Sequence, residues 1–353
     1  MLLYIHIPFC DSKCHYCAFN SYTSLHHLRD NFTDALCEQL TFELSKIDKD
    51  IIETVFIGGG TPSCLSIEQY KKIFNTINPY LINTKEITSE ANPNSATTKW
   101  LQGMYDLGVN RISFGVQSFN DKKLEFLNRN HTSTMAFDSI VNAKAIGFEH
   151  INCDIIYDTT LDTKELLYND IETIKKLPID HISAYSLTLE EGTKFYNKSN
   201  VQVENIKLAN YLFDSLTTQG FTQYEISNFA LNNDAKSKHN LGYWNYTQYI
   251  GCGAGAVGCI NNQRLYTHKD IQKYINSPTS YASTEDLTLE DIKTEKILLG
   301  LRCEVGISKD ILNDKELKQI DYLEQTNKII FKDNTYYSTD FMLADELALY
   351  ILD

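Results

Sequence analysis

Short runs of β-branched and aromatic residues alternate, up to about residue 190, with segments in which apolar residues recur every three or four positions. The runs are LLYIHIPF, TVFIGGG, KEITSEANP, RISFGVQSF, HINCDIIYD and HISAYSLT. The segments between them, such as IEQYKKIFNTI and MAFDSIVNAKAIGF, have helical periodicity. From the second run on, the units repeat roughly every thirty residues, as βα units do. The pattern predicts a parallel sheet of six βα units, an incomplete (β/α)6 TIM-type barrel.

The pattern changes after about residue 200. The stretch VENIKLANYLFDSLTTQG has helical spacing, and the region from about 224 to 268, rich in Asn, Gly and Tyr, predicts loops. The segments LTLEDIKTEKILLGL, KIIFKDNTYYSTDF and ADELALYIL then predict a helix, a hairpin and a helix. This order indicates a small α+β, winged-helix-like domain. We therefore expect an α/β chain with two domains, over residues 1–225 and 226–353.

Composition narrows the class of protein. Charged residues make up 22% of the 353 residues and hydrophobic residues 42%, which is typical of globular proteins. No run of 18 apolar residues occurs, so no membrane span is expected. The formal charge of −14 opposes binding to nucleic acid. Since the first residues lack a basic leader and a cleavage site, the nine cysteines are expected to be reduced thiols in the cytoplasm.

Several residues that are unusual for strand interiors come at the ends of the predicted strands. In parallel α/β sheets, ligands bind at the carboxyl ends of the strands. A glycine loop there lets the backbone approach a ligand. The residues in question are Gly58, Gly59, Gly60, Glu90, Asn92, Gln117 and Asp154.

Three cysteines, Cys10, Cys14 and Cys17, lie within eight residues near the start of the chain. A zinc site completed by His15 or His6 is one interpretation, but zinc loops more often contain two CxxC pairs, and this chain has no second pair. A cubane iron–sulfur cluster is usually held by four thiolates, so three would leave one iron open to another ligand. The six remaining cysteines are scattered and are expected to be small buried hydrophobic residues.

Several motifs together resemble the oxygen-independent coproporphyrinogen III oxidase-like (HemN/HemW) family of radical S-adenosylmethionine (SAM) proteins. They are YIHIPFC, CHYCAF, IGGGTPS, SEANP, GVQSF, LNRNH and HNLGYW, and they extend over nearly the whole chain. The resemblance implies a radical SAM partial barrel in which the three cysteines hold a [4Fe-4S] cluster whose open iron binds SAM. It also implies a set of SAM-contacting residues: Tyr4, Tyr16, Gly59, Gly60, Thr61, Glu90, Gln117, Arg129 and Asp154.

The family has an oxidase branch and a heme-chaperone branch, and three features favour the chaperone branch. Oxidase-type sequences continue the cysteine loop as CxxxCxxCxC, whereas Phe19 occupies the last position here. The chain also begins at the first predicted strand, without the N-terminal extension that resembles a substrate cover in the oxidase. HNLGYW matches the HNxxYW motif associated with heme binding, which makes His239, in a flexible loop, the expected heme ligand. Binding through a neutral imidazole should weaken as the pH falls.

The resemblance thus implies a cytoplasmic protein that binds a [4Fe-4S] cluster, SAM and heme and transfers heme to an acceptor protein. Any peripheral membrane association would come through that acceptor. Two alternatives remain open: oxidative decarboxylation of coproporphyrinogen III by a radical SAM enzyme, and a structural zinc or redox-sensing protein. The sequence departs from the family at DIIYDTTLDT, where a Gly-Leu-Pro turn is usual, and at Val257, where many relatives have histidine.

Overall fold

The computed structural model describes all residues from Met1 to Asp353, and its main sheet is curved and has 12 strands. Six consecutive strands at its centre are parallel and lie in chain order. They are β1 (Leu2–Ile7), β2 (Thr54–Gly59), β3 (Glu86–Ala91), β4 (Arg111–Gln117), β5 (His150–Tyr157) and β6 (His181–Ser186). The prediction of six parallel βα units is confirmed.

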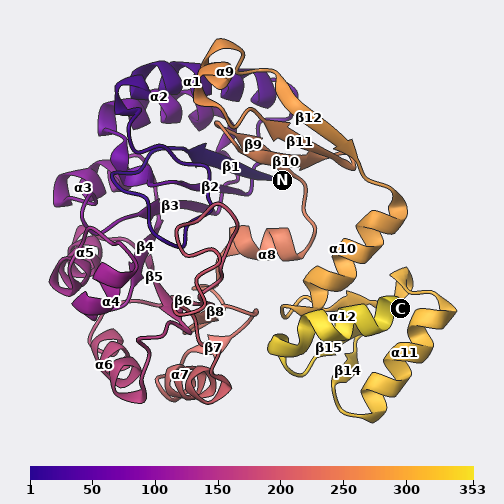
Figure 1. Ribbon diagram of the computed structural model, residues 1–353. Coiled ribbons are helices and arrows are strands. Elements are labelled where there is room, and N and C mark those ends of the chain that lie inside the picture. Colours follow the sequence, from indigo (N-terminus) through magenta and orange to yellow (C-terminus); the bar gives the residue numbers. More distant parts are fainter.

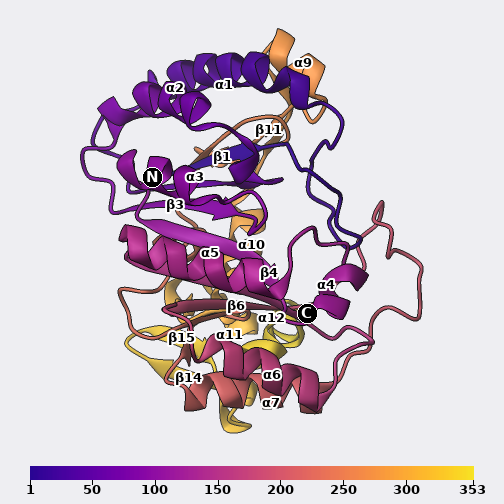
Figure 2. The same cartoon turned by 90° about the vertical axis from the view of Figure 1, so that its left-hand side faces the viewer.

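Helices that connect the strands cover the convex side of this sheet, whereas α4 (Asp121–Phe126) lies at the carboxyl ends of the strands, as Figures 1 and 2 show. The covering helices are α1 (Arg29–Leu44), α2 (Ile67–Ile77), α3 (Thr98–Asp106), α5 (Ser133–Ile146), α6 (Lys164–Ile174) and α7 (Ile206–Thr218). Side-chain caps define most of their starts. In α2, for example, Ser66 and Gln69 form a reciprocal capping box that satisfies two otherwise unpaired backbone donors.

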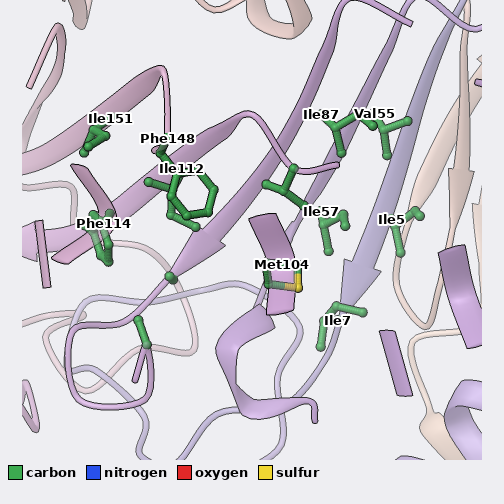
Figure 3. Packing of buried hydrophobic residues seen from close by; sticks show 14 of the residues in the cluster. Ile5, Ile7, Val55, Ile57, Ile87, Met104, Ile112, Phe114, Phe148 and Ile151 are labelled. Atoms are coloured by element: carbon green, nitrogen blue, oxygen red, sulfur yellow. The ribbon is translucent and has the colours of Figure 1, made fainter. Parts of the chain in front are cut away.

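The two faces of the parallel strands differ in polarity, because successive side chains point to opposite faces. The outward positions, among them Ile5, Ile57 and Ile112, are fully buried against the helices, as Figure 3 shows. Burying each such side chain contributes about 1.5–3 kcal/mol. The alternate positions, such as Tyr4 and Asp154, point to the concave side. This polar inner face is available to build a site.

Short strands extend the sheet beyond both ends of the parallel part. On one side lie β9 (Tyr249–Cys252), which pairs parallel with β1, followed by β10 (Val257–Ile260), β11 (Gln263–Thr267) and β12 (Tyr281–Asp286). On the other side lie β8 (Asn228–Ala230) and β7 (Thr222–Gln223), and α9 (Ile271–Asn276) joins β11 to β12. The prediction of loops over 224–268 is therefore wrong.

The strands in this region escaped prediction because they are short and rich in polar residues and glycine. The turn between β10 and β11 explains part of the asparagine content. Asn261 and Asn262 have φ values of 51° and 60°, the left-handed conformation that tight hairpin turns need and that asparagine tolerates. The asparagines therefore mark a hairpin here.

The C-terminal part has its own apolar core and a three-stranded antiparallel sheet. Its elements are α10 (Leu289–Leu301), β13 (Ile307–Ser308), α11 (Asp314–Gln325), β14 (Ile329–Lys332), β15 (Thr335–Ser338) and α12 (Ala344–Leu352). The predicted helix, hairpin and final helix are confirmed, whereas α11 and β13 were not anticipated. A domain boundary between residues 225 and 226 stays a prediction. No helix is both long and apolar enough to cross a lipid bilayer.

Candidate functional site

A cavity of about 580 Å3 opens at the carboxyl ends of the parallel strands. Its volume is within the range of small-molecule sites, about 300–1,000 Å3. We call it the cysteine pocket. Twelve of the residues expected from the sequence line it: Cys10, Cys14, Tyr16, Cys17, Gly59, Gly60, Thr61, Glu90, Asn92, Gln117, Arg129 and Asp154. Tyr4, Gly58 and His239 do not line it.

The cysteine loop follows β1 and is closed by its own hydrogen bonds. The Cys10 N–H donates to the Tyr22 carbonyl at 3.1 Å, and the Tyr22 N–H donates to the Pro8 carbonyl at 2.8 Å. Lys13 Nζ donates to the Phe19 carbonyl at 2.6 Å. These bonds bring the two ends of the loop together, so that its three thiols border a single cavity.

Two of the three sulfur atoms accept hydrogen bonds from outside the loop. Thr61 Oγ1 lies 3.3 Å from Cys10 Sγ, and Arg129 Nη1 lies 3.2 Å from Cys14 Sγ. Burial raises the pKa of the Cys10 and Cys17 thiols. The Thr61 hydroxyl opposes this rise at Cys10 and so favours the thiolate, the form that binds metals.

The histidines that would complete a zinc site have other partners. His15 Nδ1 lies 3.0 Å from the Phe126 carbonyl, and its Nε2 lies 2.8 Å from Lys194 Nζ. His6 Nδ1 lies 2.9 Å from the Tyr4 hydroxyl, and its Nε2 lies 2.9 Å from the Asn20 carbonyl. No three His, Cys, Asp or Glu side chains are grouped closely enough to hold a single metal ion.

The glycines after β2 have a packing role that the sequence analysis did not include. A Cβ atom on Gly60 would lie 2.7 Å from the Phe9 carbonyl oxygen and 2.9 Å from that of Ile7. A Cβ on Gly59 would lie 2.5 Å from the His6 ring, and Gly59 has a φ of +110°. These positions require glycine because β1 and the cysteine loop pass so close to them.

Two partly buried carboxyl groups face the cysteine pocket. Glu90 Oε2 accepts a hydrogen bond from the Gly59 N–H at 3.1 Å. Burial, together with the nearby Asp154, raises the pKa of Glu90 to about 8. Burial also raises the pKa of Asp154 to about 6, opposed by hydrogen bonds such as that from Asn152 Nδ2 at 2.6 Å. A cationic ligand would favour the ionised form of both groups.

Arg129 connects the cysteine loop to the strand ends. Besides Cys14, its guanidinium donates to the Gly115 carbonyl at 2.6 Å and to Asn92 Oδ1. Asn92 was expected only from its position after a strand, and Gly115 and Tyr185, which also line the pocket, were not anticipated. Gly115 has no side chain and Tyr185 is an ordinary strand residue, so neither indicated a ligand site in the sequence.

The unusual turn after the Asp154 strand is accommodated by Asp158. Its φ of 65° lies in the left-handed region, which glycine usually supplies and which aspartate tolerates. The Asp158 carboxylate accepts hydrogen bonds from Ser186 Oγ at 2.7 Å and from the Asn205 N–H at 3.1 Å. The turn is thus fixed by side-chain bonds, and Asp154 still lines the pocket.

A second and larger cavity, of about 1110 Å3, lies beside the first. We call it the lateral cavity. Its walls come from β1, the strands β9–β11, α10 and the helix α8 (Lys238–Trp244). Figure 1 shows α8 on the concave side of the sheet, next to α10. Six large aromatic residues contribute to the lining: Tyr4, Phe19, Tyr243, Trp244, Tyr246 and Tyr249.

The motif HNLGYW forms α8, so the expectation that His239 lies in a flexible loop is wrong. Ser237 caps the helix, its side chain accepting from the Asn240 N–H. The Glu86 carboxylate accepts the N–H groups of Lys238 and His239, each at 3.0 Å. A buried acid at the N-terminus of a short helix compensates its unpaired donors and dipole. Helix α8 is therefore firmly attached to β3.

The His239 side chain is completely buried and does not line the lateral cavity. Its Nδ1 lies 2.8 Å from Thr54 Oγ1, and its Nε2 is buried with no hydrogen-bond partner. Burial lowers the pKa of His239 to about 3, so the imidazole is neutral at physiological pH. The ring of Tyr243 packs edge-on against His239 at 4.8 Å and also lines the cavity.

Comparisons with known proteins agree with this architecture. The profile of the Radical SAM superfamily matches residues 4–171. The chain is similar to a solved structure described as coproporphyrinogen III oxidase (HemN) from Escherichia coli, a radical SAM enzyme, with a TM-score of 0.84. The two chains are 19% identical, and the alignment covers 99% of this chain and 89% of the other. At this identity the likeness shows the fold.

Sequence similarity identifies nearer relatives. The chain is 37% identical over 334 residues to the protein named heme chaperone HemW from Bacillus subtilis, an alignment that covers 91% of this chain and 88% of the relative. It is 34% identical over 324 residues to the protein of the same name from Lactococcus lactis, covering 88% and 84%. Given these matches along most of its length, the chain belongs to the HemW family of radical SAM proteins.

Proposed function

We propose that this protein is a heme chaperone that acts in the cytoplasm: it binds heme and delivers it to an acceptor protein. The observation that carries the proposal is the lateral cavity, a large space with six aromatic residues in its walls beside the cysteine pocket. Its wall includes side chains of the HNLGYW helix. All nine cysteines are free thiols, which suits a reducing compartment.

The cysteine pocket is proposed to hold a [4Fe-4S] cluster on Cys10, Cys14 and Cys17. The fit rests on three thiols that border one cavity and on the donors that reach two of the sulfurs. When bound, such a cluster supplies an open iron site and a redox centre. The remaining wall would hold SAM: Glu90 and Asp154 would face its positive charges.

Heme is proposed to bind in the lateral cavity with its ring plane among the aromatic side chains. Flat aromatic surfaces suit a planar macrocycle. The indole N–H of Trp244 is buried in this wall without a partner, so it is free to donate to a bound ligand. Heme placed here would lie next to the cysteine pocket, because Ala18 and Phe19 line both cavities.

His239 is proposed as the ligand of the heme iron. Its neutral imidazole has an Nε2 without a partner, and Thr54 contacts the opposite ring nitrogen, the arrangement that orients a ligating histidine. Tyr243 contacts the imidazole and lines the cavity, so its ring would have to move for His239 to reach a bound heme. Tyr4, which lines the lateral cavity, would then contact heme rather than SAM.

Hemin titration followed by the Soret band tests this function. Wild-type protein should bind hemin with one site, and His239→Ala should bind more weakly, by tenfold or more, while iron and sulfide content stay unchanged. Equal affinity in the two proteins would eliminate His239 as the ligand. No saturable hemin binding by the wild type would contradict the chaperone function itself.

The oxidase alternative is tested in the same preparations. Reconstituted protein is incubated without oxygen with SAM, a reductant and coproporphyrinogen III, and the porphyrinogens are analysed by chromatography. We expect no decarboxylated product. Formation of protoporphyrinogen at a catalytic rate would assign the protein to the oxidase class instead.

A further inference from the structure

The charges that line the lateral cavity have the opposite sign to the chain as a whole. The chain carries 46 acidic and 32 basic residues. The cavity is lined by four cationic side chains and a single carboxylate: Arg264, Lys269, Lys296, Arg302 and Glu295. This local excess of positive charge surrounds an aromatic space, which favours a flat ligand that carries negative groups at its edge.

The two arginines are already paired within the protein. Arg264 contacts Glu285 at 3.1 Å and Glu295 at 2.5 Å. Arg302 contacts Asp345 at 2.6 Å. Their charges are therefore largely compensated, and drawing either one to a ligand would break an existing ion pair.

The two lysines are free. Neither Lys269 nor Lys296 has a salt bridge or a side-chain hydrogen bond, and both are exposed. Lys296 Nζ lies 5.5 Å from the centre of the Tyr246 ring, which itself lines the cavity. The lysines come from different elements, the segment between β11 and α9 and the helix α10, so the cavity has an available cation on each of two walls.

We propose that Lys269 and Lys296 bind the two propionate carboxylates of heme at the edge of the lateral cavity. This inference rests on the proposed function, since it names the groups of heme that the cavity recognises. With the macrocycle among the aromatic side chains, its propionate edge would face solvent, where the exposed ammonium groups of Lys269 and Lys296 could reach it. Each exposed pair contributes a modest, salt-dependent attraction.

Hemin and hemin dimethyl ester, which lacks the two carboxylates, separate this inference from the function on which it rests. The wild type should bind hemin about tenfold more tightly than the diester, the size expected from two exposed ion pairs. In the double variant Lys269→Ala/Lys296→Ala, hemin affinity should fall to the level of the diester, and diester affinity should be unchanged. Lys273→Ala, an exposed lysine of α9 outside the cavity lining, serves as the control and should match the wild type.

The outcomes are distinct. A double variant that keeps the full preference for hemin over the diester would show that other groups recognise the propionates and would overturn the assignment. Equal binding of hemin and diester by the wild type would also overturn it, while leaving heme binding intact. Unchanged diester affinity shows that the double variant is folded. If the wild type binds neither compound, the proposed function fails and this inference fails with it.

Discussion

The cysteine pocket and the lateral cavity share Ala18 and Phe19, yet they are built in different ways. The cysteine pocket is made from the ends of consecutive parallel strands and the loops that follow them. The lateral cavity is made from segments as far apart as Tyr4 and Arg302, brought together by α8, α10 and the added strands. A site at strand ends follows from the order of the strands, whereas a site between docked elements follows from tertiary packing.

The two cavities also differ in charge. Glu90 and Asp154 place two partly buried acids in the cysteine pocket, which suit a cationic ligand. The lateral cavity has aromatic walls and free lysines, which suit a planar anion. If each cavity binds the ligand proposed for it, neighbouring spaces in one chain select ligands of opposite charge, and variants should affect the two cavities separately.

Loss of a cluster ligand should have the largest effect, because it should abolish cluster binding in the cysteine pocket and leave hemin binding in the lateral cavity unchanged. Cys14→Ala should abolish the broad visible absorbance of protein purified without oxygen, because the two remaining thiols cannot hold the cluster. Hemin affinity should stay within twofold of wild type, since Cys14 does not line the lateral cavity. Cys37→Ala is the control and should keep its iron and sulfide. Full iron content in the Cys10, Cys14 and Cys17 triple variant would place the cluster elsewhere.

Two glycine substitutions should distinguish a glycine that the fold requires, Gly60, from one that only lines the pocket, Gly115. Gly60→Val places atoms against the backbone of Phe9 and Ile7, where nothing flexible can move, so it should destabilise the fold by about 3 kcal/mol and disturb the cluster loop. In Gly115→Ala the new methyl group meets only side-chain ends, such as the Arg129 guanidinium at 3.1 Å. That variant should keep its stability and cluster but bind SAM more weakly. Denaturant unfolding measures the stability of each variant, and calorimetry measures its affinity for SAM. A Gly60→Val protein of normal stability would contradict the packing role of Gly60.

The ionisation of Glu90 should appear as a proton released on SAM binding. With its pKa raised to about 8, Glu90 is mostly protonated at pH 7 in the free pocket. A cationic ligand stabilises the carboxylate, so binding lowers this pKa, releases up to one proton and becomes tighter as the pH rises towards 8. Calorimetry in buffers of different ionisation enthalpy counts the protons. Glu90→Gln should release almost none, and an unchanged count would assign the proton to another group.

The sequence allowed the cysteine pocket to be predicted because its chemistry lies in short motifs. CxxxCxxC places three thiols in one loop, and the order of parallel strands brings Gly59, Glu90 and Asp154 to the same edge. What the sequence could not show is the close approach of Gly60 to Phe9, which depends on how the cysteine loop packs. The same holds for the contact of Arg129 with Asn92.

The lateral cavity could be predicted only in part. HNLGYW drew attention to the right segment, but its glycine and asparagine suggested a loop, whereas capping by Ser237 and Glu86 makes it a helix. Glu86 is distant in sequence from that helix, so its effect is invisible in the local pattern. Lys269 and Lys296 gave no signal either, because an exposed lysine is ordinary until its neighbours are known.

The burial of His239 should appear in the pH dependence of stability and should leave hemin affinity nearly independent of pH. An unfolded histidine titrates near pH 6.5, while the folded pKa of His239 is lowered to about 3. Below pH 6.5 the unfolded chain therefore takes up a proton that the folded chain does not, so stability is lost as the pH falls. Between pH 7 and pH 5 this residue should lower the free energy of unfolding by about 2 kcal/mol, a loss that His239→Gln should not show.

The same neutral imidazole predicts that hemin affinity changes little between pH 8 and pH 6, contrary to the loss expected of an exposed histidine. Urea unfolding at pH 7 and pH 5, with wild type and variant compared, measures the difference in stability. Parallel pH profiles would mean that His239 is accessible to solvent in the free protein.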